Sequence, residues 1–350
     1  MNALLWTHNG MEDVSAAEIK KAATNIRLDS PFVIFDVKSR EDLAALCYHG
    51  RSFRGIMQLL LVCSLDELEA EIKSADFSLA KDRTFAVRAK NFGEETDLRS
   101  IEVLVGNAVD SKVNLDSPDV TFLVFVRDGK CYVGIDFAGL DLGKRDYKLF
   151  TARASLKGSL AFSMLKIAGF KPGMTLLDPC CREGTVGIEA ALYSIDRSVH
   201  FFQKEKLAFA KFMSYDFKDK DKPNKSDIVL FDSLFHNVQS VRKNAKIADV
   251  ADILQISRVD IDWVDTRFER SSVDVIASYP MQQSERTDQK LVSKFYRELF
   301  HQADYALKKR GKMILAMRSM KPLEDSPWKP KKVLQVSQGK EILSLVLFQK

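Results

Sequence analysis

No stretch of this sequence is apolar over a run long enough to cross a membrane. The longest hydrophobic runs, such as residues 56–62, are far shorter than the roughly 20 residues that a bilayer-spanning helix needs. The amino-terminal residues also lack the basic and then apolar pattern of a signal peptide, since Glu12 and Asp13 follow closely on Trp6. We therefore expect a cytoplasmic protein without membrane contact.

Cysteine and histidine are scarce, and neither is spaced as metal ligands are. The chain has 5 cysteines and 5 histidines among its 350 residues. Cys180 and Cys181 are adjacent, which is not the spacing of a zinc site or a redox pair. The other three cysteines lie in apolar runs that are typical of a core. The sequence therefore predicts no metal site and no disulfide scaffold.

A glycine-rich dinucleotide fingerprint is also missing. No Gly-x-Gly-x-x-Gly follows any predicted strand, which argues against a nicotinamide-dependent oxidoreductase. The charge is only mildly unbalanced, with 53 basic and 48 acidic residues and a net charge of +5. Such a balance permits nucleic-acid binding without requiring it.

Residues 176–191 carry the most informative pattern in the chain. They predict the end of a buried strand, then a tight loop, then an amphipathic helix from Thr185 onward. A strand that leads through such a loop into a helix N-terminus binds ligands in open α/β sheets, because free backbone N–H groups point at the ligand. Gly184 permits a close approach, and Asp178 can accept hydrogen bonds from a ligand amine. The pattern alone is compatible with a dinucleotide, a phosphate or S-adenosylmethionine (SAM).

The length and the order of the predicted elements indicate two or three domains. Short strands and helices alternate over residues 1–50 and again over residues 51–140. Residues 141–158 are predicted to link these parts to a doubly wound α/β domain over residues 159–350. In that domain we expect strands at residues 175–177, 228–231, 273–278 and 313–317, a surface loop at 218–225, and a terminal hairpin formed by 333–336 and 342–348.

The amino-acid sequence of this loop resembles that of one protein family. Asp-Pro-x-Cys-x-x-Gly-Thr from residue 178, followed by Ile-Glu-Ala-Ala, is similar to the SAM-binding loop of THUMP-domain RNA methyltransferases. That group includes archaeal tRNA guanosine N2-methyltransferases. Their loop usually reads Asp-Pro-Met-Cys-Gly-Ser-Gly-Thr, so Arg182 and Glu183 stand here in place of Gly and Ser.

The resemblance extends over nearly the whole chain. Thr-x-x-Gly-x-Glu at residues 7–12 is similar to the ferredoxin-like part that precedes THUMP, and Lys-Val-x-Leu-x-x-Pro-Asp at 112–119 is similar to THUMP itself. Gly-x-x-Leu-x-x-Arg-x-Tyr at 139–147 resembles the phrase that leads into the catalytic domain. Ala-Ser-Leu-Lys-x-x-Leu-Ala at 154–161 resembles the helix start that follows, with Ser155 where proline is usual.

This resemblance implies a fold, a cofactor and a partner. It implies an α/β protein with an amino-terminal ferredoxin-like plus THUMP α+β region and a carboxy-terminal doubly wound, Rossmann-like methyltransferase domain. It also implies SAM as the cofactor and tRNA as the partner bound by the THUMP part. The cofactor-binding residues would be Asp178, Cys180, Gly184, Thr185, Asp232 and Asp265.

Asp232 ends the second predicted strand of this domain. An acidic side chain there can bond both ribose hydroxyls of a nucleotide. It lies well beyond the spacing of about 20 residues after Asp178 that a simple unit shows, and we attribute this to an insertion at residues 201–225. A helix N-cap is the alternative role, and one residue can do both. Asp265 matches the family's acid near the adenine amine, although an exposed loop aspartate is an equal alternative.

The substrate motif departs from the family. There the fourth strand ends in Asn-Pro-Pro-Tyr or Asp-Pro-Pro-Tyr, whose polar side chain and a proline carbonyl hold the target amine while the aromatic ring stacks on the base. The matching residues here are Ser278, Tyr279, Pro280 and Met281. Ser278 can accept one hydrogen bond, and Tyr279 can stack on a flipped base. The alternative is a strand that ends in an ordinary turn.

The hypothesis is therefore a SAM-dependent tRNA methyltransferase that acts on an exocyclic base amine, guanine N2, with Ser278, Tyr279 and Pro280 presenting the base. Methyl transfer needs no nucleophilic side chain, because it proceeds by aligning the amine lone pair with the sulfonium. The alternative is a catalytically inactive tRNA-binding paralogue or a partner of an active enzyme. An Arg182 side chain directed into the crevice would favour this alternative, and one directed outward would favour catalysis.

Basic side chains in both halves are candidates for tRNA phosphate contacts. A merely solvated face is the alternative. The candidates are Arg83, Arg88, Lys90, Arg99 and Lys112 in the THUMP-like part, and Lys144, Arg145, Lys148 and Arg153 at the junction.

Overall fold

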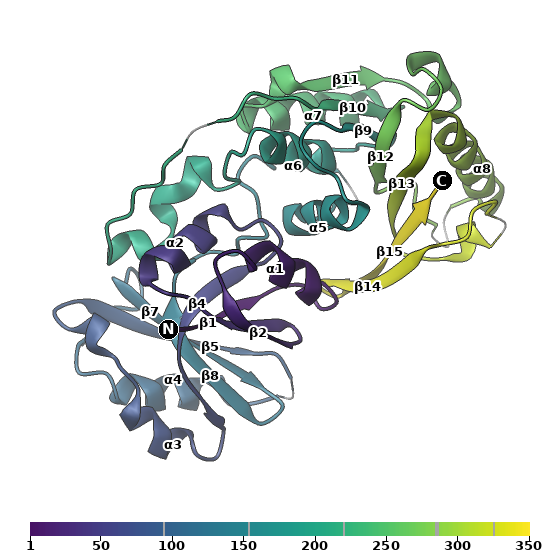
Figure 1. The fold of residues 1–350 in the computed structure, drawn as a ribbon. Helices are drawn as coiled ribbons and strands as arrows, with labels where there is room; N and C mark the ends of the chain where they lie inside the picture. The colour runs from purple at the N-terminus through teal and green to yellow at the C-terminus, as the bar shows by residue number, and fades with distance from the viewer. Residues whose placement is uncertain (94, 153–154, 220, 284–286, 325) are drawn as a thin grey trace. The chain divides into compact units, whose positions relative to one another are not determined.

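A computed structural model describes residues 1–93, 95–152, 155–219, 221–283, 287–324 and 326–350 (Figure 1). The chain divides into two compact units, which we describe separately. Unit 1 comprises Met1–Thr7, Ala16–Leu142 and Phe202–Lys218, and unit 2 comprises His8–Ser15, Gly143–Phe201 and Asp219–Lys350. Arg153 and Ala154, which belong to two of the sequence patterns, lie outside the described residues.

Unit 1 is built on one mixed sheet with the strand order β2-β3-β1-β4-β8-β7-β5-β6. The strands are β1 (Asn2–Trp6), β2 (Thr24–Asp29), β3 (Phe32–Asp36), β4 (Gly55–Ser64), β5 (Thr84–Asn91), β6 (Lys112–Val113), β7 (Val120–Arg127) and β8 (Lys130–Asp136). The helices are α1 (Glu12–Ile19), within which the two units divide, α2 (Arg40–His49), α3 (Leu68–Glu71) and α4 (Leu98–Asn107). The expected hairpin around Asp128-Gly129 is the antiparallel β7–β8 pair.

The two parts expected before and after residue 50 share this sheet. β4 pairs antiparallel with β1 on one side and with β8 on the other. One sheet therefore continues from the amino-terminal strands into the strands of the THUMP-like part, with a register shift between Leu59 and Leu61 in β4.

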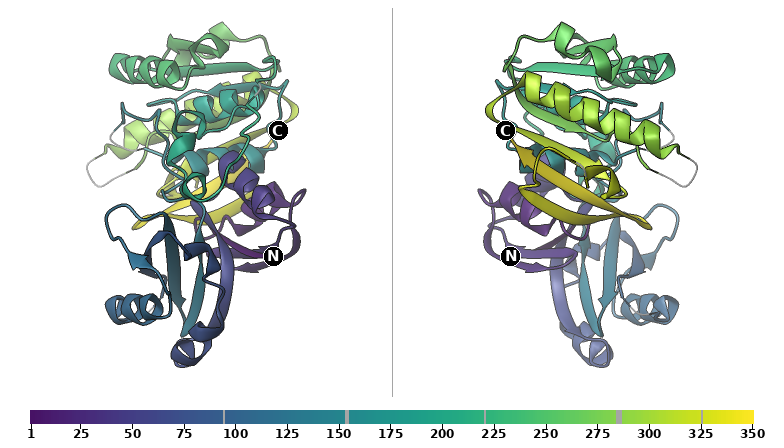
Figure 2. Two further views of the ribbon diagram at one scale, coloured as in Figure 1. Left: turned by 90° about the vertical axis from the view of Figure 1, so that its left-hand side faces the viewer. Right: turned by 90° about the vertical axis from the view of Figure 1, so that its right-hand side faces the viewer.

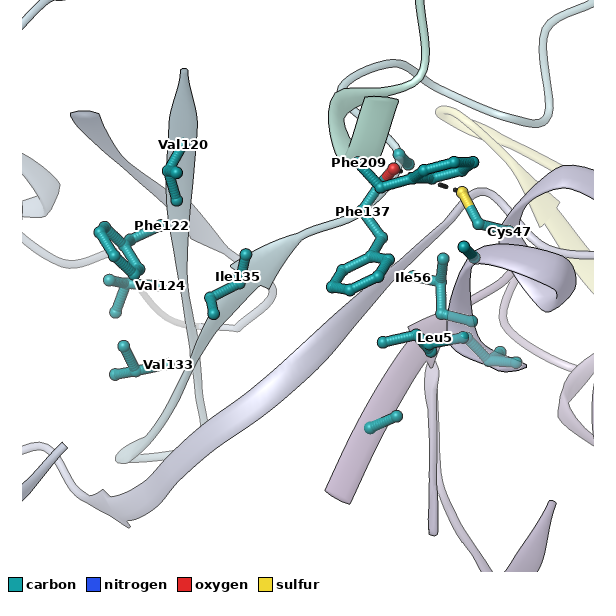
Figure 3. Packing of buried hydrophobic residues seen from close by; sticks show 14 of the residues in the cluster. Leu5, Cys47, Ile56, Val120, Phe122, Val124, Val133, Ile135, Phe137 and Phe209 are labelled. Carbon is teal, nitrogen blue, oxygen red and sulfur yellow. Dashed lines mark hydrogen bonds between the residues drawn. The ribbon is translucent and has the colours of Figure 1, made fainter. Parts of the chain in front are cut away.

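The core of unit 1 includes the segment that the sequence presents as an insertion in the second domain. Leu207, Phe209 and Phe212 are buried in the same hydrophobic cluster as Phe137 at the end of β8. Figure 3 shows Phe209 and Phe137 in this cluster, with the Cys47 thiol donating a hydrogen bond to the Phe137 carbonyl oxygen at 3.4 Å. Residues 202–218 thus return to unit 1 and help to build its core.

Unit 2 is a doubly wound domain with the strand order β11-β10-β9-β12-β13-β15-β14. Its strands are β9 (Thr175–Asp178), β10 (Asp227–Asp232), β11 (Leu254–Arg258), β12 (Val273–Ser278), β13 (Leu307–Met317), β14 (Lys332–Gln338) and β15 (Glu341–Gln349). Its helices after the division in α1 are α5 (Gly158–Ala168), α6 (Thr185–Ser194), α7 (Phe235–Ile247) and α8 (Gln289–Ala306). β9 to β13 pair in parallel, and the terminal hairpin joins antiparallel to β13.

Both faces of this sheet are buried, because successive apolar residues of its strands point to opposite faces. Leu176 and Leu230 point into the cluster that contains residues of α5, α6 and α7. Leu177 and Phe231, one residue along each strand, point into the cluster that contains residues of α8. Figure 2 shows α8 lying across one face of the sheet.

The expected α/β fold with a Rossmann-like carboxy-terminal domain is therefore confirmed, as are its four expected parallel strands and its hairpin. β11 was not among the predicted strands, because it is an edge strand whose exposure follows no clean alternation. In the described part of the chain, none of the helices combines the length and the apolar character that membrane crossing requires.

Candidate cofactor and substrate site

The sheet topology of unit 2 creates a crevice at one place. β9 pairs with β10 on one side and with β12 on the other. The strands that follow β9 in the chain are therefore added first on one side of it and then on the other, and the switch point lies between β9 and β12. Ligands of open α/β sheets bind at the carboxyl ends of the strands at such a switch point. Asp178 ends β9 and Ser278 ends β12, which places the two predicted motifs together.

The loop after β9 is fixed by its own backbone hydrogen bonds. The Cys180 N–H donates to Asp178 Oδ1 at 3.2 Å, and the Cys181 N–H donates to the carbonyl oxygen of Phe231 at 2.8 Å. The Gly184 N–H then donates to the Cys181 carbonyl oxygen at 2.7 Å, which closes a turn in front of α6. The predicted strand, loop and helix are therefore all present.

Gly184 is required by this turn and by the packing of α7. It caps α6 with φ of +85°, a conformation that glycine adopts without strain. A Cβ at this position would lie 2.7 Å from Cγ1 of Val241 in α7. Gly184 does not line the cavities described below, so we assign its missing side chain to helix packing.

Asp178 is buried and carries a strongly perturbed carboxyl group. Desolvation raises its pKa to about 7, and the nearby Asp232 carboxylate adds to the rise. The hydroxyl of Ser278, which donates to Asp178 Oδ1 at 2.7 Å, and the Cys180 N–H oppose it. Near neutral pH this carboxyl therefore lies between its protonated and ionised forms, and an added cation would favour ionisation.

The two cysteines of the loop do not supply a nucleophile. Burial raises the pKa of both Cys180 and Cys181 well above the ordinary thiol value, and Asp178 raises each further. Both thiols are therefore protonated at neutral pH, as expected of packing residues.

Glu183, which stands where the family has a small residue, is turned into the protein. Its carboxylate pairs with Lys148 at 3.1 Å and accepts a hydrogen bond from the Thr185 hydroxyl at 3.0 Å. Close by, the fully buried Arg145 and Glu189 form an ion pair at 2.7 Å. Arg145 and Lys148 hold carboxylates of unit 2, which removes them from the candidates for phosphate contact.

A cavity of about 440 Å³ opens beside the loop, between the ends of β10 and β11 and helix α8. This is a typical size for a small-molecule site. Its lining combines acidic, neutral polar and apolar side chains with one lysine and one arginine. The residues are Pro179, Cys180, Arg182, Asp232, Ser233, Leu234, Asn237, Asp260, Ile261, Asp262, Met281, Leu291, Lys294 and Phe295.

Asp232 lies in this cavity and also orders the chain around it. Its Oδ2 accepts the N–H of Arg182 at 2.9 Å, and its Oδ1 accepts the N–H of Leu234 and the amide of Asn237, both at 3.0 Å. The carboxylate thus ties the β9 loop to the start of α7. Since each carboxylate oxygen has two lone-pair directions, Oδ1 is fully used by its two donors, whereas Oδ2 keeps one direction free to accept a hydrogen bond.

Asp265, the residue expected near the adenine amine, is not among the residues that line the cavity. Its N–H donates to Gln302 Oε1 at 2.7 Å, at the start of a separate short helical turn. Asp260 and Asp262, which directly follow β11, line the cavity instead. The signal that could have identified them is their place just after a strand end, which is also what singled out Asp232.

The motif at the end of β12 faces inward. Ser278 is fully buried, and its hydroxyl donates to Asp178. It does not line the 440 Å³ cavity. Tyr279 is also buried, whereas Met281 lines the 440 Å³ cavity and its carbonyl oxygen accepts the hydroxyl of Tyr296 at 2.9 Å. Pro280 contributes its carbonyl oxygen, which accepts from Gln282 Nε2 at 2.9 Å.

The Arg182 side chain crosses the crevice to this motif. Its Nε donates to the carbonyl oxygen of Tyr279 and one terminal nitrogen donates to that of Pro280, each at 2.7 Å. The guanidinium carbon lies 4.9 Å from the centroid of the Tyr279 ring. Arg182 holds φ of +53°, in the left-handed region that favours glycine. The side chain is therefore directed inward, the direction that favours the inactive alternative.

The space beside Asp178 and Thr185 is small. A second hollow there, lined by residues that include Asp178, Arg182, Thr185 and Tyr279, holds only about 10 Å³. The nucleoside-sized cavity is open, whereas the adjoining space next to the β9 carboxylate is filled by protein.

Comparisons with known proteins agree with the resemblance. Residues 145–340 match the family described as RMKL-like, methyltransferase domain, and residues 63–136 match the THUMP domain. The tRNA (guanine(6)-N2)-methyltransferase of Archaeoglobus fulgidus is 34% identical over 201 residues, which cover 52% of this chain and 51% of that protein. The protein of the same name from Methanocaldococcus jannaschii is 29% identical over 287 residues, covering 75% and 74%. The match thus spans about half the length of the first relative.

Solved structures share the fold. TrmN from Thermus thermophilus superposes with a TM-score of 0.77 at 20% identity, covering 100% of this chain and 99% of that one. SMU.472 complexed with SAH superposes with a TM-score of 0.83 at 19% identity, covering 99% and 97%. Both likenesses extend over the full chain and concern its architecture.

Proposed function

Because the chain belongs to the family of RMKL-like methyltransferase domains, we propose that it transfers a methyl group from SAM to the N2 amine of a guanine in tRNA. The observation that carries the proposal is the 440 Å³ cavity at the switch point of the sheet, with Asp232 at the end of β10. Relatives named tRNA (guanine(6)-N2)-methyltransferase support the choice of substrate. A cytoplasmic location is part of the same proposal.

The open cavity fits the nucleoside part of SAM. Asp232 would accept a hydrogen bond from a ribose hydroxyl through the free acceptor direction of Oδ2. Ile261 and Leu234 offer apolar faces to a purine, and Asp260 or Asp262 takes the place foreseen for Asp265 near the adenine amine. These lining residues match the polar and apolar parts of a nucleoside.

The amino-acid part of SAM would reach Asp178. A buried carboxyl whose pKa lies at about 7 gains from a ligand ammonium group, because the added positive charge stabilises its ionised form. The hollow beside it holds only about 10 Å³, so the residues around it would have to move apart for this part to enter. Cys180 and Thr185 line that same hollow and would contact this part.

When bound, SAM supplies an electrophilic methyl group on a sulfonium. The chain's own residues would exclude water and orient the target base. The carbonyl oxygens of Tyr279 and Pro280 point into the crevice, where the Arg182 guanidinium now meets them. The ring of Tyr279 provides the stacking surface. Ser278 would act through Asp178 rather than on the base, since its hydroxyl is committed there.

Unit 1 would grip the tRNA through its THUMP domain at residues 63–136. Arg99 and Lys112 are exposed there and suit phosphate contacts. Lys90 lies above the rings of Trp6 and Phe125, at 5.6 and 5.9 Å from their centroids, which orients its ammonium group beside an aromatic surface.

Two measurements test the proposal. Isothermal titration should detect S-adenosylhomocysteine binding, and Asp232→Ala should abolish it, whereas Asp227→Ala at the opposite end of β10 should not. Methyl label from SAM should then enter tRNA at guanine N2. No binding heat and no incorporation would reject the proposal.

A second candidate is a tRNA-binding protein without catalysis, and the inward Arg182 side chain is the observation that favours it. It predicts that tRNA binds with no methyl incorporation. Incorporation at any guanine would reject it.

A further inference from the structure

We propose that the Arg182 side chain is an internal competitor of the target guanine, which closes the base site in the free protein and is displaced when the base enters. The inference rests on the proposed function, since it assigns the base site to the carbonyl oxygens of Tyr279 and Pro280. It reconciles an inward arginine with a methyltransferase domain.

Three contacts define what this site accepts. Two carbonyl oxygens of consecutive residues each take one N–H of Arg182 at 2.7 Å, and the Tyr279 ring lies 4.9 Å below the guanidinium carbon. The site therefore binds a planar group with two neighbouring N–H donors on one edge, against an aromatic face.

Guanine presents the same edge. Its N1–H and its N2 amine flank one carbon, as the Nε–H and a terminal N–H flank the guanidinium carbon of arginine. Adenine and cytosine place an acceptor beside their amine, so they would donate to one of the two carbonyl oxygens and set an acceptor against the other. Losing one such bond costs about tenfold or more in affinity. The contacts of the Arg182 guanidinium thus indicate that the base site accepts the N1–H and N2 edge of guanine.

Arg182 can leave the site without unfolding the loop. The residue is only half-buried, so its side chain can move toward solvent. Its backbone N–H bond to Asp232 at 2.9 Å is independent of the side chain and holds the loop in place. Two charge-assisted bonds, offset by the ordering of a long side chain, favour the closed state by about tenfold. The apparent affinity for guanine falls by the same factor.

The test is the affinity for guanosine monophosphate, measured on the full-length protein saturated with S-adenosylhomocysteine. Arg182→Gly removes the competitor and suits φ of +53°. The matched control is Arg310→Gly, because Arg310 is exposed in β13 and also has a positive φ, of +68°. Arg182→Gly should bind the nucleotide about tenfold more tightly than the wild type, and Arg310→Gly should match the wild type.

Guanidinium ion should take the place of the missing side chain in Arg182→Gly and close the base site again. Millimolar guanidinium chloride is expected to weaken nucleotide binding to Arg182→Gly, with no equal effect from potassium chloride or on Arg310→Gly. Equal nucleotide affinity in Arg182→Gly and the wild type would overturn the inference.

Methyl incorporation into tRNA separates this inference from the proposed function. If the competitor acts as inferred, Arg182→Gly lowers the KM for tRNA about tenfold and leaves kcat within about twofold. Methylation by the wild type with unchanged nucleotide affinity and KM in the variant would refute the competitor alone. Tighter nucleotide binding without methylation by any variant would refute the enzyme and keep the competitor.

Discussion

The Asp178 carboxyl should make the stability of unit 2 depend on pH in an unusual direction. Burial raises its pKa to about 7 in the folded protein, against 3.8 for the free side chain. Between these values the folded state binds more protons at this site than the unfolded chain does. The free energy of unfolding therefore falls as the pH rises from 4 through 7, and the stabilising contribution is fully present only below about pH 4.

The magnitude follows from the size of the shift. One pKa unit corresponds to about 1.4 kcal/mol, so the full shift sets an upper limit of about 4 kcal/mol. Over the range from pH 5 to pH 8, the wild type should lose about 2–3 kcal/mol through this residue alone. Asp178→Asn cannot titrate, yet its amide oxygen can still accept from the Ser278 hydroxyl and the Cys180 N–H.

Urea unfolding at several pH values measures the difference. The chain has 3 tryptophans, and in a Trp6→Phe background the remaining two, Trp263 and Trp328, both report on unit 2. The stability difference between the wild type and Asp178→Asn should shift toward the variant as the pH rises. Asp227→Asn, at the exposed start of β10, is the control and should follow the wild type. Parallel pH profiles for the wild type and Asp178→Asn would refute a carboxyl that is protonated in the folded state.

Two further substitutions test the packing that supports the site. Glu189→Gln leaves the buried Arg145 without its counter-charge and should cost about 3–5 kcal/mol in thermal unfolding. Its control, Glu341→Gln, breaks the exposed pair with Arg318 and should cost less than about 1 kcal/mol; equal losses would contradict the assignment. Gly184→Ala should cost about 1–3 kcal/mol through its positive φ and its contact with Val241, and a second change, Val241→Ala, should restore part of it. No loss in the single variant would count against the turn described.

Local patterns predicted the parts of the site whose geometry is local. The strand, the loop and the helix of residues 176–191 follow from hydrophobic periodicity and turn residues, and the structure contains all three. The two phrases that carried the resemblance also meet physically, since the Arg of one pairs with the Glu of the other as Arg145 and Glu189. Arg145 and Glu189 therefore belong to one structural unit, although the two sequence patterns that contain them are separate in the chain.

Elements that depend on distant partners were not predictable in this way. β11 is short and lies at the sheet edge, so its side chains follow no strict alternation, and without it Asp260 and Asp262 could not be identified as cavity residues. Likewise, nothing in residues 202–218 indicates that Phe209 packs in the core of unit 1 rather than in the domain that surrounds it in sequence. Both features are decided by long-range contacts, which a single sequence does not reveal.

The departures from the family at Arg182 and at residues 278–281 looked like two independent signs of lost activity. The structure joins them, because the guanidinium of Arg182 rests on the ring of Tyr279 and bonds the carbonyl oxygens of Tyr279 and Pro280. An arginine in place of a loop glycine gains an aromatic partner where the family has proline, so each change gives the other a favourable contact. Two coupled substitutions are a single structural event. They weigh against catalysis only as much as one inward side chain does, and the 440 Å³ cavity beside it stays open.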